Sequence, residues 1–342
     1  MAKSFIPLAL AGLLTLAGGH AALAQTAAPE YAPQYAYGAD VGWVTQEEAE
    51  GIKFRDQTGA VADPFVLLKN LGINAIRLRV WVDPKDGWNG KADLLAKAKR
   101  AAAQGQKLMI DFHYSDNWAD PGKQVKPAAW AGHDVQQLTA DVAAHTADVL
   151  SYLKSNGIDV AWVQVGNEIR NGLLWPDGDA KHFANMAAFT NAGYDAVKAV
   201  YPDAKVIIHI DNGWDDAACR YFFDNFTANG GKVDIIGLSY YPYWSTSKDW
   251  KIANPQLGET MTDMVSRYNK PVMVVETGFQ YDDPVNAKAM LSDVIARNQA
   301  LGVNGQGVFY WEPDGDPNWS HYPLSAMDKD GKFTAAMDAF KH

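Results

Sequence analysis

The sequence predicts an α/β fold, a (β/α)8 TIM barrel, and three observations lead to this prediction. Eight short apolar runs rich in Val, Ile and aromatic residues recur along the chain. Segments of good helix formers separate the runs, and strands that alternate with helices pair in parallel. No G-x-G-x-x-G or P-loop motif follows an early run, which disfavours a doubly wound sheet with a phosphate site. Eight such units suit a barrel, which typically takes about 250 residues.

The strands and helices of this barrel can be placed along the chain. The expected strands are residues 37–43, 74–81, 107–113, 160–166, 205–211, 233–241, 271–277 and 307–312. The expected helices include residues 93–104, 134–155, 185–200, 259–268 and 285–301. Each helical segment would return the chain to the start of the next parallel strand.

The first residues have the features of an export signal rather than of a folded element. Lys3 supplies the positive charge, residues 5–16 form a short apolar core, and an A-x-A cleavage site ends at Ala24. The alternative, a membrane span, needs about 20 apolar residues, and this run is interrupted by glycine. We therefore expect cleavage after Ala24, a loose leader over residues 25–35, and a single barrel domain over residues 36–342 that is secreted or periplasmic.

Composition and charge narrow the range of partners. Hydrophobic residues make up 48% of the chain and charged residues 20%, as in ordinary globular proteins. The net charge of −10 disfavours nucleic acid or an anionic membrane as a partner, because both attract cationic proteins. The single cysteine, Cys219, excludes an internal disulfide, and we expect it to be a small buried hydrophobe. The 12 Trp suit sugar rings, which have apolar faces and hydroxyl rims.

Polar side chains gather at the carboxyl ends of the expected strands, where barrel enzymes place their active sites. They are Arg77, Arg79, Asp111, His113, Asn167, Glu168, His209, Asp211, Ser239, Tyr241, Glu276 and Glu312. Because side chains alternate in direction along a strand, those two residues apart share a face. The same parity favours Tyr241 over Tyr240 as the inward tyrosine. Facing inward, these side chains would converge on one pocket.

Two of these residues, Glu168 and Glu276, indicate the chemistry. Hydrolysis of a glycosidic bond needs one carboxylic acid to protonate the leaving oxygen and one carboxylate to attack or to activate water. A single Glu at a strand end is more often a salt-bridged rim residue. A pair at the ends of the fourth and seventh strands would instead face each other across the barrel mouth. The pair therefore favours a glycosidase.

Motifs at all eight expected strands carry a family resemblance. In chain order they are GADVGW, NAIRLRVWVDP, DFHYSDNWADPG, VGNEIRNGLLWP, IHIDNGW, GLSYYPYW, VVETG and GVFYWEP. Together they resemble glycoside hydrolase family 53, the endo-β-1,4-galactanases, from Gly38 to Pro313. The Asn-Glu pair is shared by a wider superfamily of retaining barrels, whereas HYSDNWADP, GNEIRNGLLWP and SYYPYW are specific to the galactanases.

The resemblance implies a role for each matched residue. Glu168 would be the acid/base and Glu276 the nucleophile of a retaining enzyme that cuts internal β-1,4-galactosidic bonds by double displacement. Arg77 would lower the pKa of Glu276, and Tyr241 would donate a hydrogen bond to it. Asn167 would bind the sugar 2-hydroxyl. The other implied sugar-binding residues are Asp40, His113, Trp118, Trp175, His209, Asp211 and Trp311.

Several alternatives remain open at this point. Trp118 and Trp175 could pack in the core instead of stacking on sugars. His113 and His209 lack a third ligand at zinc spacing, and residues 278–286 form a loop too short for the calcium site of some family members, so we expect no metal and no organic cofactor. A retaining glycosidase for mannan, xylan or glucan and a glycan-binding protein without catalysis are rival functions. The expected partner is the polysaccharide β-1,4-galactan, bound by a monomer without nucleic acid or membrane partners.

Overall fold

The barrel that the sequence predicts is present in the structure. The computed structural model describes residues 1–2 and 35–341. Eight parallel strands close into a barrel in the order β1-β10-β9-β8-β7-β4-β3-β2. They are β1 (Ala36–Asp40), β2 (Ala75–Val80), β3 (Lys107–Phe112), β4 (Trp162–Val165), β7 (Lys205–Ile210), β8 (Ile235–Tyr240), β9 (Val272–Thr277) and β10 (Gly305–Trp311). A small antiparallel pair, β5 (Gly172–Leu173) and β6 (Gly178–Asp179), lies in the loop after β4.

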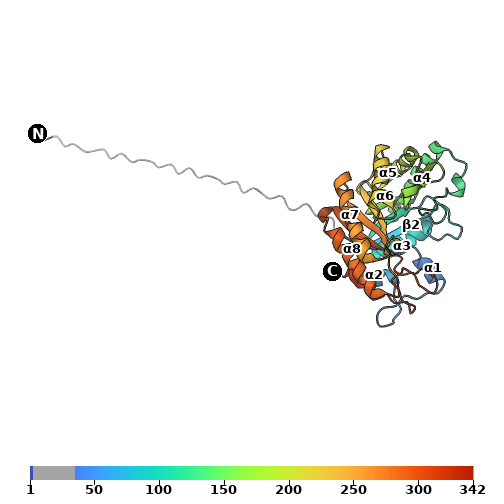
Figure 1. Ribbon diagram of the computed structural model, residues 1–342, viewed down its shortest axis with the longest axis vertical. Helices are drawn as coiled ribbons and strands as arrows, with labels where there is room; N and C mark the ends of the chain where they lie inside the picture. Colours follow the sequence, from blue (N-terminus) through green and yellow to red (C-terminus); the bar gives the residue numbers. More distant parts are fainter. Residues whose placement is uncertain (3–34, 342) are drawn as a thin grey trace. The chain divides into compact units, whose positions relative to one another are not determined.

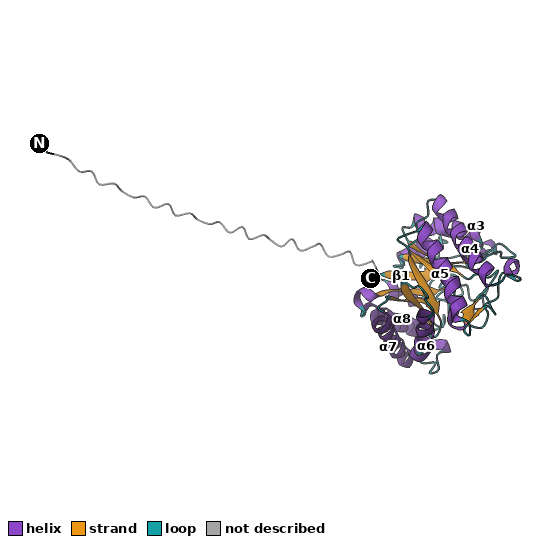
Figure 2. Ribbon diagram, turned by 90° about the horizontal axis from the view of Figure 1, so that it is seen from above, coloured by secondary structure: helices purple, strands orange, loops and turns teal. Residues whose placement is uncertain are grey.

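Helices connect the strands and surround them, as Figures 1 and 2 show. They are α1 (Val44–Ala49), α2 (Pro64–Asn70), α3 (Lys91–Ala103), α4 (Val135–Ser155), α5 (Phe183–Val200), α6 (Asp216–Ala228), α7 (Trp250–Tyr268) and α8 (Pro284–Gln299). The predicted helices correspond to α3, α4, α5, α7 and α8. Helix α7 begins at Trp250 rather than at Glu259, because the Asp249 side chain caps it and Pro255 is accommodated inside the helix.

The predicted export signal and leader fall almost wholly outside the described residues, which resume at Tyr35. From Tyr35 to Lys341 the described chain lies within one compact unit. In this part of the chain no helix is both long and apolar enough to cross a membrane. Cys219, on α6, is buried and free, as the sequence predicts.

Two apolar layers support the barrel. The larger one fills the space between the strands and the surrounding helices. The smaller one fills the inside of the barrel with residues that point inward from the strands: Ala36, Ala75, Met109, Trp162, Ile207, Ile235, Met273, Val275 and Phe309. Because this inner layer closes the barrel, the polar side chains that follow it on the same strands are held at the carboxyl end, away from the opposite face.

A β-bulge in β9 determines which way Glu276 points. The pairing register of β9 shifts between Val274 and Glu276 against β8, and between Val274 and Thr277 against β10. Val275 points into the barrel, and yet Glu276, the next residue, also reaches an inward side chain of β2. An extra residue in a strand re-aims the side chains beside it. The bulge therefore turns Glu276 into the mouth of the barrel.

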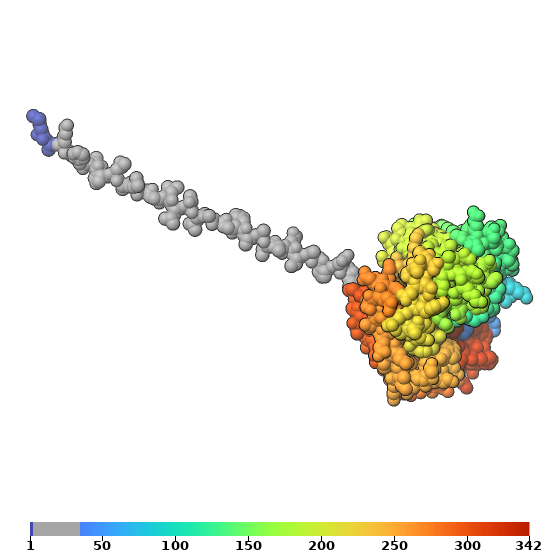
Figure 3. Space-filling model, turned by 45° about the horizontal axis from the view of Figure 1, so that its top comes forward, coloured from blue at the N-terminus to red at the C-terminus, as the bar shows by residue number. Residues whose placement is uncertain are grey.

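The segment that follows β1 lies beside the C-terminal segment of the chain. Figure 3 shows the two in contact, the first in blue and the second in red, and a backbone bridge joins Arg55 to Lys332. Their loops also meet at the barrel mouth, where the Trp43 and Tyr322 rings lie 5.9 Å apart. Both ends of the barrel domain thus contribute to one wall of the cleft.

Candidate active site

A cavity of about 440 Å³ opens at the carboxyl ends of the strands. Glu168 and Glu276 both line it, together with Asn167 and Tyr241. Its aromatic wall consists of Trp43, Trp118, Trp311 and Tyr322. The cavity combines two carboxyl groups with flat apolar surfaces, which is the combination that a sugar ring requires.

A second hollow of about 250 Å³ adjoins the first. Glu168, Tyr241 and Trp244 line both, whereas Glu276 lines only the larger one. Asp211 and Trp214 complete the smaller hollow. Glu168 therefore stands between two spaces, and Trp244, at 53% exposure, forms an edge of each.

Glu276 is held by two side chains. Nη1 of Arg77 lies 2.8 Å from Oε1, and the Tyr241 hydroxyl donates to Oε2 at 3.1 Å. The parity argument for Tyr241 is thereby confirmed, because Tyr240 points away and donates to Asn254 in the core. Each oxygen of the Glu276 carboxylate thus has a fixed partner, so the orientation of the carboxylate toward the cavity is fixed as well.

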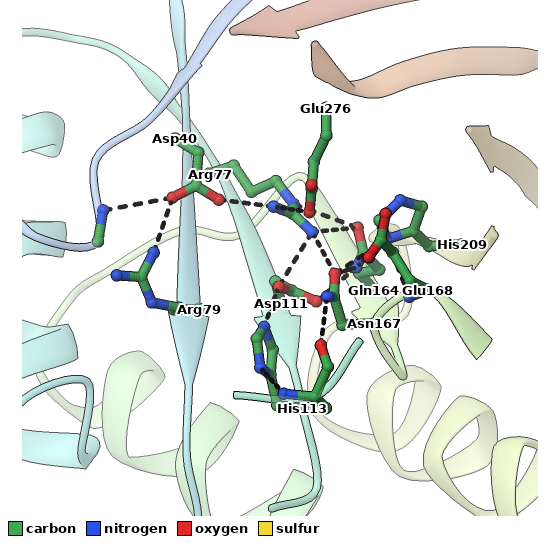
Figure 4. A network of polar contacts seen from close by, with 12 residues as sticks. Asp40, Arg77, Arg79, Asp111, His113, Gln164, Asn167, Glu168, His209 and Glu276 are labelled. Carbon is green, nitrogen blue, oxygen red and sulfur yellow. Dashed lines mark hydrogen bonds and ion pairs between the residues drawn. The ribbon is translucent and has the colours of Figure 1, made fainter. Parts of the chain in front are cut away.

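Arg77 is the centre of the buried polar network in Figure 4. Its guanidinium contacts Asp40 at 2.6 Å and Asp111 at 3.0 Å, in addition to Glu276. It also donates to Gln164 at 3.2 Å and to Oδ1 of Asn167 at 2.8 Å. Arg77 is 1% exposed, so three carboxylates and two amides satisfy a charge that would otherwise be costly to bury.

Glu168 takes a left-handed backbone conformation, with φ of 49°, three residues after the end of β4. Its backbone N–H donates to Nδ1 of His209 at 3.3 Å. Since Nδ1 accepts this bond, the proton of the neutral ring sits on Nε2, which lies 2.7 Å from the Ser239 hydroxyl. Burial, with Arg77 nearby, holds the pKa of His209 well below its ordinary value, so the imidazole is neutral.

Burial raises the pKa of both glutamates. For Glu168 the pKa lies well above its ordinary value because of burial and because Glu276 and Asp211 are close. For Glu276 burial raises the pKa to about 7 against the lowering effect of Arg77. Arg77 lowers the pKa of Glu276, as the resemblance implies, but the net pKa lies above its ordinary value because desolvation outweighs the ion pair. The Arg77 ion pair still favours the charged form at Glu276 rather than at Glu168.

The other predicted sugar-binding residues fall into three groups. Trp118, Trp311 and His113 line the larger cavity, and Asp211, paired with Arg170 at 2.7 Å, lines the smaller one. Asp40 and His209 are buried behind the cavity wall, where Asp40 contacts Arg77 and His209 contacts the Glu168 backbone N–H and the Ser239 hydroxyl. Trp175 lines neither hollow.

Trp175 instead donates its indole N–H to the backbone carbonyl of Asn171 at 2.9 Å. His113 accepts the indole N–H of Trp81 at Nδ1, 3.2 Å away, and its Nε2 lies 2.9 Å from Asp111. Neither histidine that could have suggested zinc belongs to a metal-binding group, and no group of three or more such side chains is found in residues 1–2 and 35–341.

Sequence reasoning missed several residues of the site. Gln164 forms hydrogen bonds with both Arg77 and Asp111. Its position as a polar residue within an apolar strand could have identified it from the sequence. Trp43 and Tyr322 reach the cavity from loops, where no strand parity applies. Trp244, the last residue of the SYYPYW motif, lines both hollows and was not among the predicted site residues.

Two carboxyl groups facing one cleft at the carboxyl end of a (β/α)8 barrel, beside an aromatic wall, define the active-site class of the barrel glycoside hydrolases. The model of glycosyl hydrolase family 53 matches residues 36–340. The chain belongs to this family and is a glycoside hydrolase.

Several galactanases and solved structures are similar to the chain over most of its length. The chain is 38% identical over 299 residues to the probable arabinogalactan endo-β-1,4-galactanase A of Neosartorya fischeri, covering 81% of this chain and 83% of that protein. It is 35% identical over 297 residues to the arabinogalactan endo-β-1,4-galactanase A of Emericella nidulans, with 81% and 84% covered. A solved fungal β-1,4-galactanase superposes with a TM-score of 0.84 at 30% identity, covering 90% of this chain and 99% of that one. The family 53 catalytic domain of Ignisphaera aggregans gives 0.81 at 30% identity, with 90% and 95% covered.

Proposed function

We propose that the protein is a retaining endo-β-1,4-galactanase in which Glu276 is the nucleophile and Glu168 the acid/base. The observation that carries the assignment of roles is the asymmetry of the pair: Glu276 is ion-paired with Arg77, whereas Glu168 lies between two hollows and forms no ion pair within the described part of the chain. The galactanase names of the relatives support the substrate.

The two hollows match the two halves of a cleaved chain. The sugar that is attacked must contact both carboxyl groups, and only the larger cavity offers both. The departing sugar must contact the proton donor alone, and the smaller hollow offers Glu168 without Glu276. A chain that passes from one to the other would place its glycosidic oxygen at Glu168, and two adjoining hollows on either side of the acid suit cleavage inside a polymer.

In the first step, Glu276 attacks the anomeric carbon while the protonated Glu168 gives its proton to the departing oxygen. In the second step, Glu168 takes a proton from water, which then hydrolyses the galactosyl-enzyme and restores both carboxyl groups. Asn167, positioned by Arg77, would hold the 2-hydroxyl of the attacked sugar. Trp311 would form the floor below it.

The mechanism predicts the separation of the two carboxyl groups. Direct attack by Glu276 requires about 5 to 5.5 Å between them, because no water stands between nucleophile and sugar. The separation is to be measured in a crystal structure of the enzyme with bound galactobiose. A value near 9 Å would indicate an inverting enzyme instead.

Substrate selectivity is the test of the proposed activity. The axial oxygen at C4 of galactose bends the chain, and polar groups placed for it would be left unpaired by glucan or mannan, at about 1 to 3 kcal/mol per group. We expect rapid internal cleavage of β-1,4-galactan to short oligosaccharides. The rates on cellulose, mannan and xylan should be at least about hundredfold lower than the rate on galactan.

The measurement is the initial release of reducing sugar from these four polymers, with products sized by chromatography and Glu276→Ala as the blank. Comparable rates on mannan would overturn the galactan assignment, and galactose as the sole early product would overturn internal cleavage. If the protein binds galactan but releases no reducing sugar from it, the glycan-binding alternative would be supported instead.

We also propose that the chain is exported and cleaved after Ala24, and that residues 25–35 form a leader before a single catalytic domain, residues 36–342. The charged start, apolar core and A-x-A site support this. Amino-terminal sequencing of the secreted protein should begin at Gln25, and gel filtration should give a monomer.

A further inference from the structure

Arg79, the second arginine of β2, lies directly behind the aromatic wall of the cleft. Its side chain is 1% exposed. Its Cζ lies 4.3 Å from the ring centroid of Trp118, 5.7 Å from that of Trp43 and 5.9 Å from that of Trp311. Cations within about 6 Å of an indole centroid are attracted to the ring. One buried cation thus contacts three of the tryptophans that face the sugar-binding cavity.

The position of the guanidinium is fixed from its other side. Nη1 of Arg79 is ion-paired with Glu312, at the end of β10, and lies 3.5 Å from Oδ1 of Asp40. Gly42 leaves room for this group, since a Cβ at that position would lie 2.1 Å from Nη1. In the described part of the chain Nε and Nη2 of Arg79 have no hydrogen-bond partner, and the centroid of the Trp118 ring lies 4.3 Å from Cζ.

The three indoles contact one another as well as this cation. They contact one another edge to face, with centroids 5.0 Å apart for Trp43 and Trp311 and 5.9 Å apart for Trp118 and Trp311. Among the described residues none of the three makes a side-chain hydrogen bond, in contrast to Trp81, whose N–H donates to His113. Ring contacts and Arg79 are therefore what orients them.

We propose that Arg79 is a positioning residue for sugar binding: its guanidinium, fixed by Glu312, holds the indoles of Trp43, Trp118 and Trp311 in the arrangement that binds the sugar chain. This inference rests on the proposed function, because it takes the occupant of the cleft to be a sugar. Arg79 touches neither Glu276 nor the cavity itself. Loss of its effect should therefore weaken the binding of substrate and transition state alike, which raises KM and leaves kcat nearly unchanged.

The main variant is the double substitution Arg79→Met with Glu312→Gln. Removing both charges avoids a buried carboxylate without a partner, which would destabilise the fold for a different reason. Arg79→Lys keeps the charge and loses the planar group, so it should recover part of the effect. Gly42→Ala keeps Arg79 and Glu312 and displaces the guanidinium, so it tests the position independently of the charge.

The matched control is Arg100→Met, on α3. Arg100 also combines an ion pair, 2.7 Å to Glu48, with an aromatic ring, 4.7 Å to the centroid of Phe65, but it lines neither hollow. Its side chain is 26% exposed, so it reports what the loss of a partly exposed arginine with an ion pair and a ring contact does away from the cleft.

Two measurements on the purified proteins decide the matter. Near-ultraviolet circular dichroism without substrate should show a loss of tryptophan signal in the double variant and in Gly42→Ala, and none in Arg100→Met. On β-1,4-galactan the double variant should raise KM about tenfold with kcat within about threefold of wild type. Gly42→Ala should also raise KM, and the KM of Arg79→Lys should lie between those of wild type and the double variant.

An unchanged KM in Gly42→Ala and in a folded double variant would overturn the proposal, as would a fall in kcat at constant KM. If the double variant does not fold, Arg79→Lys and Gly42→Ala decide by the same criteria. A wild-type enzyme that releases nothing from galactan contradicts the proposed function instead, and the circular dichroism comparison then still decides whether Arg79 orders the indoles.

Discussion

Replacing Glu276 by alanine is expected to abolish turnover on every substrate, with a loss of roughly 10⁴-fold or more in kcat. The reason is that no other described carboxylate in the cavity is ion-paired and aimed at the same point. Glu168→Ala should lose as much on galactan but retain measurable activity on an aryl galactooligosaccharide, whose leaving group needs no proton.

Azide distinguishes the two roles. With Glu168→Ala, azide should restore the rate and yield the β-galactosyl azide, since the glycosyl-enzyme still forms on Glu276. With Glu276→Ala it should yield the α-azide by direct displacement. The opposite pairing of variants and products would mean that the two roles are exchanged.

Replacing Arg77 by methionine is expected to have the second largest effect. Three carboxylates, Asp40, Asp111 and Glu276, would lose their shared cation, which in a buried site costs about 3 to 5 kcal/mol of stability. Because a preorganised charge beside the reacting group would also be lost, kcat/KM should fall roughly 10²- to 10³-fold.

The pH profile separates the electrostatic effect of Arg77 from damage to the fold. Glu276 must be ionised to attack, so activity is present above its pKa and lost as pH falls through it. Arg77 lowers that pKa against the larger effect of burial, so its removal raises the pKa further. The acidic limb of kcat/KM should therefore move to higher pH in Arg77→Met and less in Arg77→Lys, which keeps the charge. An unmoved limb in a folded variant would contradict the role of Arg77.

The strands and their catalytic ends could be predicted because they depend on short-range patterns. Apolar runs identify strands, parity identifies which side chains face inward, and the carboxyl ends of parallel strands meet. The inward directions of Arg77, Asp111 and Tyr241 follow from these rules, whereas the hydrogen bond from Tyr241 to Glu276 was implied by the family resemblance. Helices α1, α2 and α6 were not among the predicted ones, since the first two are too short to show a period.

What could not be predicted depends on three-dimensional context. The bulge before Glu276 has no signature in VMVVET, although the inward direction of that side chain depends on it. The pKa of Glu276 depends on the balance of burial against one ion pair, and burial cannot be computed from spacing. Arg79 was noted as an inward residue, but the three indoles around it come from different loops and strands.

The left-handed backbone at Glu168 has a consequence for heat tolerance. A residue with a Cβ loses about 1 to 2 kcal/mol in this conformation, and burial of the carboxyl close to Glu276, which raises its pKa, costs further stability. Glu168→Gly should remove both costs, and Glu168→Ala only the cost of the buried carboxyl, so the melting temperature should rise from wild type to Ala to Gly by a few degrees in all. Scanning calorimetry of the three proteins measures the order. The working enzyme would then be the least durable of the three, with its upper temperature limit set partly at the residue that moves the proton.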